Sequence, residues 1–321
     1  MTDNKILIHI GYPKTASTWL QKTVFSNENL GFTPFSPFSK IENDPRGDMQ
    51  ALKYFVDQSD VDFNSELVYQ ELNSCIKQSN LLNMVYVLSN ECFVFPIFKQ
   101  GYYKMTADRI YQVFPNGKIL CLIREQKAAI FSLYNQIIKL GINYSSTLEE
   151  FLGIKSGGRL NLGIDVSVYK YDQIIEYYQT KFGKNNVLFL PFEVFVKNKK
   201  ECLIKIINFV EIDANIKEIE ILANEKYINE KLKSGTIEIK RIMNRIFYQP
   251  YKIGKEQLIR RKIVTKLTPL VQNLIPERMH VQAEKRLKGI IEEYCQDMYK
   301  ESNQKTSELI GYNLSDLGYD C

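Results

Sequence analysis

The stretch that decides the fold is Lys5–Phe25, KILIHIGYPKTASTWLQKTVF. Its first six residues form an apolar run of the length expected for a buried parallel strand. After Gly11, Tyr12 and Pro13 the apolar residues take the spacing of one helix face. The stretch therefore predicts a strand, a tight turn and a helix in direct succession, with Lys14 in the turn.

This turn has the chemistry of an anion site. The first backbone N–H groups of a helix have no partner within the helix, and they lie at the positive end of its dipole. Lys14 adds a positive charge, and Thr15, Ser17 and Thr18 add hydroxyl donors. The GxxxxGK[ST] loop of ATPases and GTPases does not match, because here the lysine precedes Ala16 at the front of the loop. No apolar strand ending in a lone aspartate follows as a magnesium partner. We therefore predict a phosphate-binding loop of another kind.

Residues 13–20, PKTASTWL, resemble the loop of the sulfotransferases that use 3'-phosphoadenosine 5'-phosphosulfate (PAPS). In that family a strand runs into PK(S/T)G(S/T)(S/T)xL, whose lysine and hydroxyls hold the 5'-phosphosulfate. Here an alanine replaces the usual glycine, which leaves less room for a close backbone approach. The resemblance implies that the cofactor is bound by Lys14, Thr15, Ala16, Ser17, Thr18 and Trp19.

A second strand and helix, GKILCLIREQKAAIFSLYN at 117–135, make the resemblance more specific. The family places an arginine at the end of this strand and a serine eight residues later, and both bind the 3'-phosphate of the cofactor. Arg124 and Ser132 stand at that spacing. A guanidinium grips phosphate with two parallel hydrogen bonds, and a serine hydroxyl can reach the same group. The Asp/Asn-Pro that commonly follows the arginine is here Glu125-Gln126.

Two residues are candidates for the general base. The run MVYVLSNECFVF at 84–95 predicts a buried strand, and polar residues at the end of such a strand lie where ligands bind. The family keeps its base near this strand end, and carbohydrate-modifying branches often use a glutamate, so the resemblance implies Glu91. A structural interpretation, in which Glu91 caps a helix or pairs with a lysine, stays open. His9 is either a buried core histidine or the second choice of base.

Weaker matches follow later in the chain. Tyr171 lies near the start of a predicted amphipathic helix, where the family has a tyrosine on the adenine side of the cofactor. The strand predicted at 186–195 carries Glu193, to which we assign a structural role. Lys231 and Lys233 stand where the family has a late basic loop that closes over the 3'-phosphate. The tail at 301–321, ESNQKTSELIGYNLSDLGYDC, resembles the end of bacterial sulfotransferase-like chains. If Glu91 is the base, the resemblance implies their carbohydrate-modifying branch.

A basic stretch at 240–262 carries eight Lys or Arg residues and the single acidic residue Glu256. Such a stretch suits an anionic glycan, a lipid head group at a membrane surface or nucleic acid, and it also fits an ordinary solvated face. We favour a glycan or lipid-linked glycan, and we do not favour nucleic acid. The loops at 26–47 and 143–163 are predicted to lie over the acceptor site.

Composition sets the class of the whole chain. Its 321 residues are 45% hydrophobic, with a formal net charge of +5, as in an ordinary globular protein. No repeat or Pro/Ser-rich linker divides it, so we expect one α/β domain over 1–321: a P-loop-like, doubly wound, mainly parallel sheet flanked by helices. A mostly helical section is expected over about 220–321, with one helix at 277–302.

The chain begins without the apolar segment of a signal peptide and has no apolar run of about 18 residues. Its six cysteines show no CxxC pairing, and it has only two histidines. We therefore expect a cytoplasmic protein, at most peripheral to the inner face of a membrane, without a metal site.

Together these features predict a sulfotransferase that moves the sulfuryl group of PAPS to a hydroxyl of a carbohydrate or lipid-linked glycan. The resemblance implies an in-line displacement that releases adenosine 3',5'-bisphosphate, and we expect it to need no Mg²⁺. Two alternatives stay open: a nucleotide kinase on a related fold, which needs ATP and a magnesium ligand, and a non-catalytic protein that binds polyanions through 240–262 in a salt-dependent way. The sequence does not name the acceptor, because specificity lies on variable loops.

Overall fold

The structure is a computed structural model that describes residues 5–35, 49–79, 81, 83–94, 103–141, 145–155, 163–225, 231–247 and 255–321, without the side chains of 49–50, 78–79 and 255–258. Parts of the predicted acceptor loops and of the basic stretch therefore lie outside the described residues. The chain divides into two compact units. The first contains residues 1–125, 170–227 and 300–321, and the second contains 126–169 and 228–299.

The first unit is built on a five-stranded sheet in the order β2-β3-β1-β4-β5, and every neighbouring pair is parallel. Its inner strands are buried almost throughout, because helices cover both faces, and such strands are continuous apolar runs in the sequence. The α/β fold with a parallel sheet is therefore confirmed. The strands are β1 (Lys5–His9), β2 (Phe32–Pro34), β3 (Val85–Ser89), β4 (Lys118–Ile123) and β5 (Val187–Pro191).

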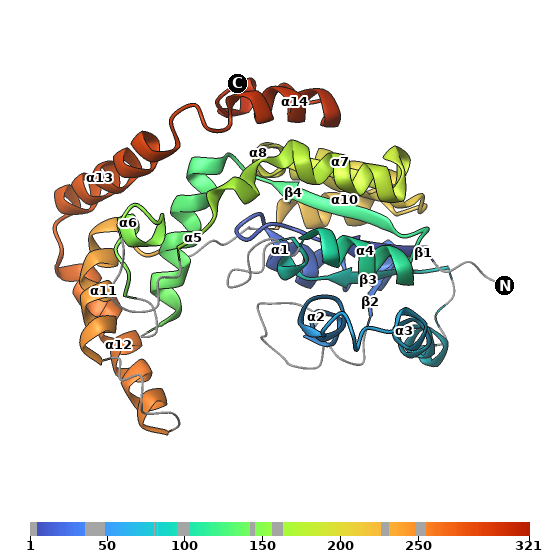
Figure 1. Ribbon diagram of the computed structural model, residues 1–321, viewed down its shortest axis with the longest axis horizontal. Helices are drawn as coiled ribbons and strands as arrows, with labels where there is room; N and C mark the ends of the chain where they lie inside the picture. Colours follow the sequence, from blue (N-terminus) through green and yellow to red (C-terminus); the bar gives the residue numbers. More distant parts are fainter. Residues whose placement is uncertain are drawn as a thin grey trace. The chain divides into compact units, whose positions relative to one another are not determined.

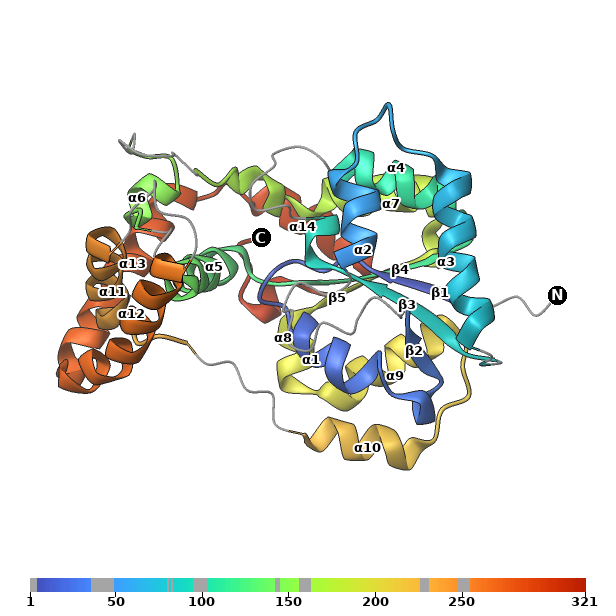
Figure 2. The same ribbon diagram turned by 90° about the horizontal axis from the view of Figure 1, so that it is seen from below.

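Helices flank this sheet on both sides (Figures 1 and 2). One face is covered by α1 (Ser17–Trp19) with its continuation Leu20–Val24, α8 (Phe192–Lys197), α9 (Lys199–Val210) and α10 (Ile216–Asn224). The other is covered by α2 (Met49–Leu52) with its continuation Lys53–Asp57, α3 (Ser65–Ser79), α4 (Tyr103–Val113), α7 (Tyr171–Phe182) and α14 (Lys300–Ile310). Short 3-10 turns occupy Glu28–Leu30, Glu91–Phe93, Lys184–Asn186 and Ser315–Leu317.

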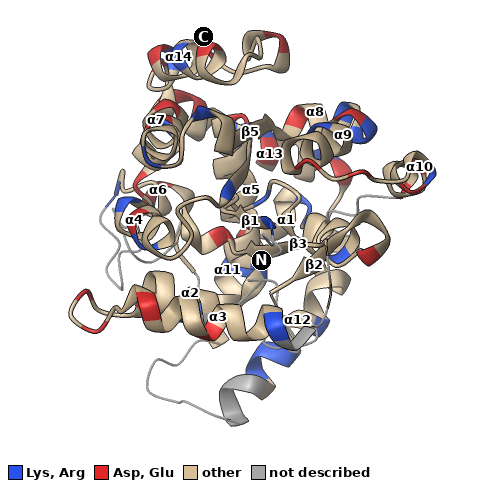
Figure 3. Ribbon diagram, turned by 90° about the vertical axis from the view of Figure 1, so that its right-hand side faces the viewer, with Lys and Arg blue, Asp and Glu red and all other residues tan. Residues whose placement is uncertain are grey.

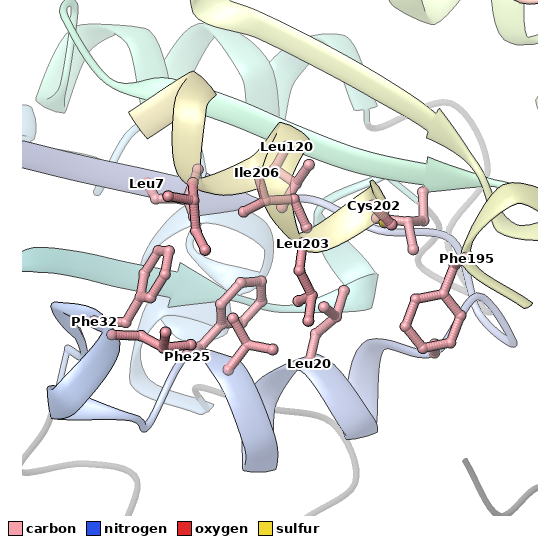
Figure 4. Close-up of a cluster of buried hydrophobic side chains, with 14 of the residues drawn as sticks. Leu7, Leu20, Phe25, Phe32, Leu120, Phe195, Cys202, Leu203 and Ile206 are labelled. Atoms are coloured by element: carbon pink, nitrogen blue, oxygen red, sulfur yellow. The ribbon is translucent and has the colours of Figure 1, made fainter. Parts of the chain in front are cut away.

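A hydrophobic cluster packs two helical segments against the sheet (Figure 4). These segments are α9 and α1 with its continuation to Val24. The helical spacing of apolar residues on α9 turns one face toward the sheet, so that Leu203 has no exposed surface while its neighbour Ile204 is 38% exposed. Burial of such side chains is the main favourable term for this half of the unit. The labelled members in Figure 4 are Leu7, Leu20, Phe25, Phe32, Leu120, Phe195, Cys202, Leu203 and Ile206.

Replacing Leu203 by alanine is expected to lower the free energy of unfolding by about 3 kcal/mol, since it removes three carbons from a packed core and leaves a cavity. Urea unfolding followed by circular dichroism measures the change. Ile204→Ala on the same helix is the matched control and is expected to cost less than about 1 kcal/mol. Equal losses in the two variants would contradict the assignment of the buried face.

All regular secondary structure among the described residues of the second unit is helical. Its central helix, α11, packs against α5, α12 and α13, and Asn244 on α11 donates a hydrogen bond to the carbonyl of Ile138 on α5 (3.1 Å). The expected C-terminal helical section is thus joined by residues from the middle of the chain. The single domain expected over 1–321 stays a prediction. The helices are α5 (Gln126–Leu140), α6 (Leu148–Phe151), α11 (Ser234–Phe247), α12 (Lys255–Leu274) and α13 (Glu277–Cys295), with a 3-10 turn at Val166–Tyr169.

The strand predicted at 84–95 ends at Ser89, and a 3-10 turn follows at Glu91–Phe93. The loop predicted at 26–47 contains β2, whose Phe32 is fully buried in the core.

Two further predicted elements are wrong in their boundaries. The strand expected to reach Phe195 ends at Pro191, which adopts a φ of −67° and lies directly before α8, so Glu193 lies on a helix. The helix expected over 277–302 is two helices, since Gln296 adopts a φ of 28° that no helix continues. The apolar spacing runs across both breaks, and periodicity alone does not reveal them. No helix among the described residues is long and apolar enough to span a membrane.

Candidate active site

The candidate site lies in the first unit, at the carboxyl ends of β1, β3 and β4. His9, the last residue of β1, is in register with Ser89 at the end of β3 and with Leu120 of β4. The segments that leave these strands therefore emerge beside one another. Because β1 lies between β3 and β4, this is the point where a doubly wound sheet binds its ligand.

The loop between β1 and α1 has an unusual backbone. Lys14 and Ala16 both adopt a φ of 69°, in the left-handed region that residues other than glycine rarely occupy. The Thr15 hydroxyl donates a hydrogen bond to the Tyr12 carbonyl (2.6 Å), and Arg124 Nη1 donates one to the Lys14 carbonyl (3.1 Å). The proton of Thr15 is thus used to close the loop, a contact that the sequence motif does not reveal.

Replacing Ala16 by glycine is expected to leave the protein as stable as the wild type, or more stable by up to about 1 kcal/mol. Glycine removes the cost of a left-handed alanine, and its greater freedom in the unfolded chain offsets part of the gain. Ala16→Val, which is β-branched, is expected to lose about 2 kcal/mol at the same position. Urea unfolding of the three proteins gives the order, and a valine variant as stable as the glycine variant would contradict this loop geometry.

Ser17 and Glu91 interact electrostatically in the candidate site. The Ser17 hydroxyl is buried and has no hydrogen-bond partner within bonding distance. Burial raises the pKa of Glu91 to about 7, although the nearby Ser17 hydroxyl and the Lys14 ammonium both lower it. The influence of Ser17 on this pKa places the two groups near each other, while their geometry falls short of a hydrogen bond. Glu91 is therefore a carboxylate that exchanges its proton near neutral pH beside the loop lysine.

His9 is held by a chain of polar groups. Its Nδ1 lies 2.8 Å from Ser89 Oγ, which accepts a hydrogen bond from Gln21 Nε2 (2.9 Å). Burial lowers the pKa of His9 to about 3, so the imidazole is neutral. Its Nε2 has no partner, and a Cβ added to Gly11 would lie 2.8 Å from that atom and 3.1 Å from Ser17 Oγ. Two unpaired polar atoms thus lie close to Gly11, and a side chain at this position would clash with the imidazole of His9.

Arg124 leaves the end of β4 with its side chain fixed on two sides. Its guanidinium lies 4.9 Å from the ring centroid of Phe192, and one of its N–H groups holds the Lys14 carbonyl. Tyr171 is fully buried, donates its hydroxyl to the Arg124 carbonyl (2.6 Å) and packs edge-on against Tyr12. The hydroxyl of Tyr171 therefore positions the backbone of Arg124. A contact of Tyr171 with adenine stays a prediction.

Glu193 and Tyr319 also support this strand end, through contacts that join distant parts of the chain. Glu193 accepts hydrogen bonds from the Glu125 backbone N–H (3.0 Å) and from the Tyr319 hydroxyl (2.9 Å). Burial raises the pKa of Glu193 above its ordinary value, and these hydrogen bonds offset only part of that rise. The structural role predicted for Glu193 fits these contacts, and the only available signal for Tyr319 was the resemblance of the chain's tail.

Other predicted residues take different places. Thr18 is exposed, and the Trp19 ring packs on Phe195 (5.1 Å between centroids) in the hydrophobic cluster. Ser132, Lys231 and Lys233 belong to the second unit. Ser132 is buried with an unpaired hydroxyl, and the Lys233 ammonium pairs with Glu277 (2.6 Å). Binding of the 3'-phosphate by these three residues stays a prediction. Among the described residues, no group of three or more His, Cys, Asp or Glu side chains is arranged to hold a metal ion.

Comparison with known proteins identifies the family of the chain. A sulfotransferase domain model matches residues 3–318. The crystal structure of a sulfotransferase from Alicyclobacillus acidocaldarius aligns with a TM-score of 0.52 and 13% identity over 98% of this chain and 99% of that one. A mouse sulfotransferase, SULT7A1, complexed with PAP (91% of this chain, 89% of that one) and the sulfotransferase domain from the curacin biosynthetic pathway (82% and 97%) each give a TM-score of 0.41 at 16% identity. No curated protein matches the chain.

The parallel sheet and the lysine- and hydroxyl-rich loop after its first strand define a phosphate-binding α/β protein. With the family model matched over nearly its whole length, the chain belongs to the sulfotransferase domain family. It is a sulfotransferase whose sulfuryl donor is PAPS. Family membership favours this function over a kinase and over a non-catalytic polyanion binder.

Proposed function

We propose that the acceptor is a hydroxyl group of a carbohydrate or lipid-linked glycan, as in the carbohydrate-modifying branch of bacterial sulfotransferases. The observation that carries the proposal is Glu91, a carboxylate with a pKa raised to about 7 by burial beside Ser17 and Lys14. A sugar hydroxyl is a weak acid and needs a base during its attack on sulfur, and a pKa near neutrality suits that task. We also propose that the protein is cytoplasmic and peripheral to the inner face of a membrane.

In the proposed mechanism the acceptor oxygen forms a bond to sulfur while the bond from sulfur to the bridging oxygen of PAPS breaks. Glu91 accepts the hydroxyl proton, and Lys14 stabilises the negative charge that develops on the departing 5'-phosphate. Ser17, whose buried hydroxyl is unpaired, donates to the phosphosulfate. His9 stays neutral and offers Nε2 to the same region, and it is our second choice of base. Arg124 holds the 3'-phosphate.

Transfer from ³⁵S-labelled PAPS to a panel of acceptors tests the proposal. The panel contains neutral oligosaccharides, an undecaprenyl-linked saccharide, a phenol and an aromatic amine, each at equal hydroxyl or amine concentration. We expect label in the saccharides, with Glu91→Gln as the negative control. Label in the phenol or the amine alone would overturn the acceptor class while leaving PAPS-dependent transfer intact.

A further inference from the structure

Helix α12 of the second unit carries an exposed apolar stripe. Successive residues of an α-helix are rotated by about 100° about its axis, so the members of the stripe fall within an arc of about 80°. They therefore form one continuous face. They are 38% to 82% exposed, whereas large side chains of this kind are normally buried. The stripe consists of Ile259, Ile263, Leu267, Leu270 and Leu274.

The stripe is not the face with which α12 packs in its own unit. Val264 and Thr268 lie on a different side of the helix and are buried. Lys240 of α11 donates a hydrogen bond to Thr268 Oγ1 (3.1 Å), and Thr268 donates to the Val264 carbonyl (2.6 Å). A helix of a globular protein needs one apolar face for folding, and α12 has that face already. Contiguous exposed apolar surface beyond it marks an interaction site.

Cations border the stripe. By the same helical geometry Lys262 and Lys266 lie along one edge and Arg260 along the other. The sequence from Gln257 to Pro276 contains no Asp or Glu, and Figure 3 shows the basic residues of α12 in blue. Long basic side chains can lay their methylene stems along an apolar surface while their charges reach water or phosphate. An apolar face edged by Lys and Arg is typical of helices that lie in the interface of an anionic membrane.

We propose that α12 docks the chain on an anionic lipid surface, with its stripe at the boundary of head groups and acyl chains and its bordering cations against lipid phosphates. A second copy of the chain fits this face less well, because a two-fold contact brings Lys262 and Lys266 of both copies together, and no acidic residue from 257 to 276 can pair with them. Docking would bring the enzyme to a lipid-linked acceptor. This consequence rests on the proposed function, whereas the docking itself does not.

Co-sedimentation of the full chain with vesicles, without PAPS, tests the surface. Vesicles of phosphatidylcholine alone are compared with vesicles that also contain phosphatidylglycerol. Ile263→Gln/Leu270→Gln removes apolar contacts, and Lys262→Gln/Lys266→Gln removes charges. The matched controls in the first unit are Val61→Gln/Leu67→Gln, at exposed apolar residues, and Lys184→Gln/Lys197→Gln, at exposed lysines. Circular dichroism and thermal unfolding verify that each variant folds.

We expect the wild type and both controls to bind the anionic vesicles and to bind phosphatidylcholine at least tenfold more weakly. The apolar double variant is expected to lose at least tenfold in partition coefficient, and the lysine variant about fivefold per charge. Failure of the wild type to bind, or equal binding by stripe variants and controls, would overturn the proposal. Self-association of the wild type that disappears in Ile263→Gln/Leu270→Gln, without vesicle binding, would assign the stripe to a second copy. Binding of adenosine 3',5'-bisphosphate, measured separately, is unaffected by any of these outcomes.

Discussion

Replacing Lys14 by alanine is expected to lower kcat for sulfuryl transfer about a thousandfold. The lysine belongs to a loop whose left-handed backbone and Arg124 contact hold it at the end of β1. Negative charge grows on the bridging oxygen and the 5'-phosphate as the bond to sulfur breaks, and a fixed ammonium stabilises that charge more in the transition state than in bound PAPS. The loss should therefore appear mainly in kcat.

Steady-state kinetics with saturating acceptor measures this loss. Lys22→Ala, at an exposed lysine on the helix that follows the loop, is the matched control and is expected to keep wild-type kcat. If Lys14→Ala raised the KM for PAPS while kcat stayed unchanged, Lys14 would bind PAPS without stabilising the transition state, and the mechanism would be wrong at this residue.

The second large effect is expected at Glu91. As a general base it is active when deprotonated, and burial raises its pKa to about 7. The kcat/KM of the wild type should therefore rise about tenfold per pH unit below 7 and level off above it. Glu91→Gln should lose between about a hundredfold and ten thousandfold and should lack this rise, because glutamine takes up no proton.

The pH profile also separates the two base candidates. His9, with a pKa lowered to about 3, is neutral over the whole accessible range and contributes no rise near pH 7. Rates measured from pH 5 to 9 with wild type, Glu91→Gln and the exposed control Glu28→Gln decide between them. A rise near pH 7 that persists in Glu91→Gln would exclude Glu91 as its origin, and a flat wild-type profile would favour His9.

Much of the fold could be predicted because its signals are local. The apolar runs of β1, β3 and β4 are buried on both faces, and such strands are visible in the sequence without any partner. The loop residues Lys14 and Ser17 were predicted from one contiguous motif. The start of α8 at Phe192 and the break at Gln296 were missed, because both are backbone events within an unbroken apolar pattern.

The supporting contacts could not be predicted, because they join residues far apart in the chain. The Gln21–Ser89–His9 chain depends on the register of β1 and β3, which no single segment encodes. The same holds for Tyr171, whose hydroxyl holds the backbone of Arg124, and for the use of the Thr15 proton to close the loop. Sequence motifs predict which groups bind ligand, and tertiary structure adds contacts that orient those groups.

The most direct test of the central claim, that the loop and Arg124 form a PAPS site, is calorimetry in EDTA. Wild type and Arg124→Ala are titrated with adenosine 3',5'-bisphosphate, with adenosine 5'-phosphate and with ATP. We predict micromolar binding of the bisphosphate to the wild type, with ATP much weaker. We also predict a loss of between about tenfold and a hundredfold in Arg124→Ala, and a much smaller loss for the ligand that lacks the 3'-phosphate. No binding, binding only of ATP with Mg²⁺, or equal losses for both adenosine phosphates would contradict the account.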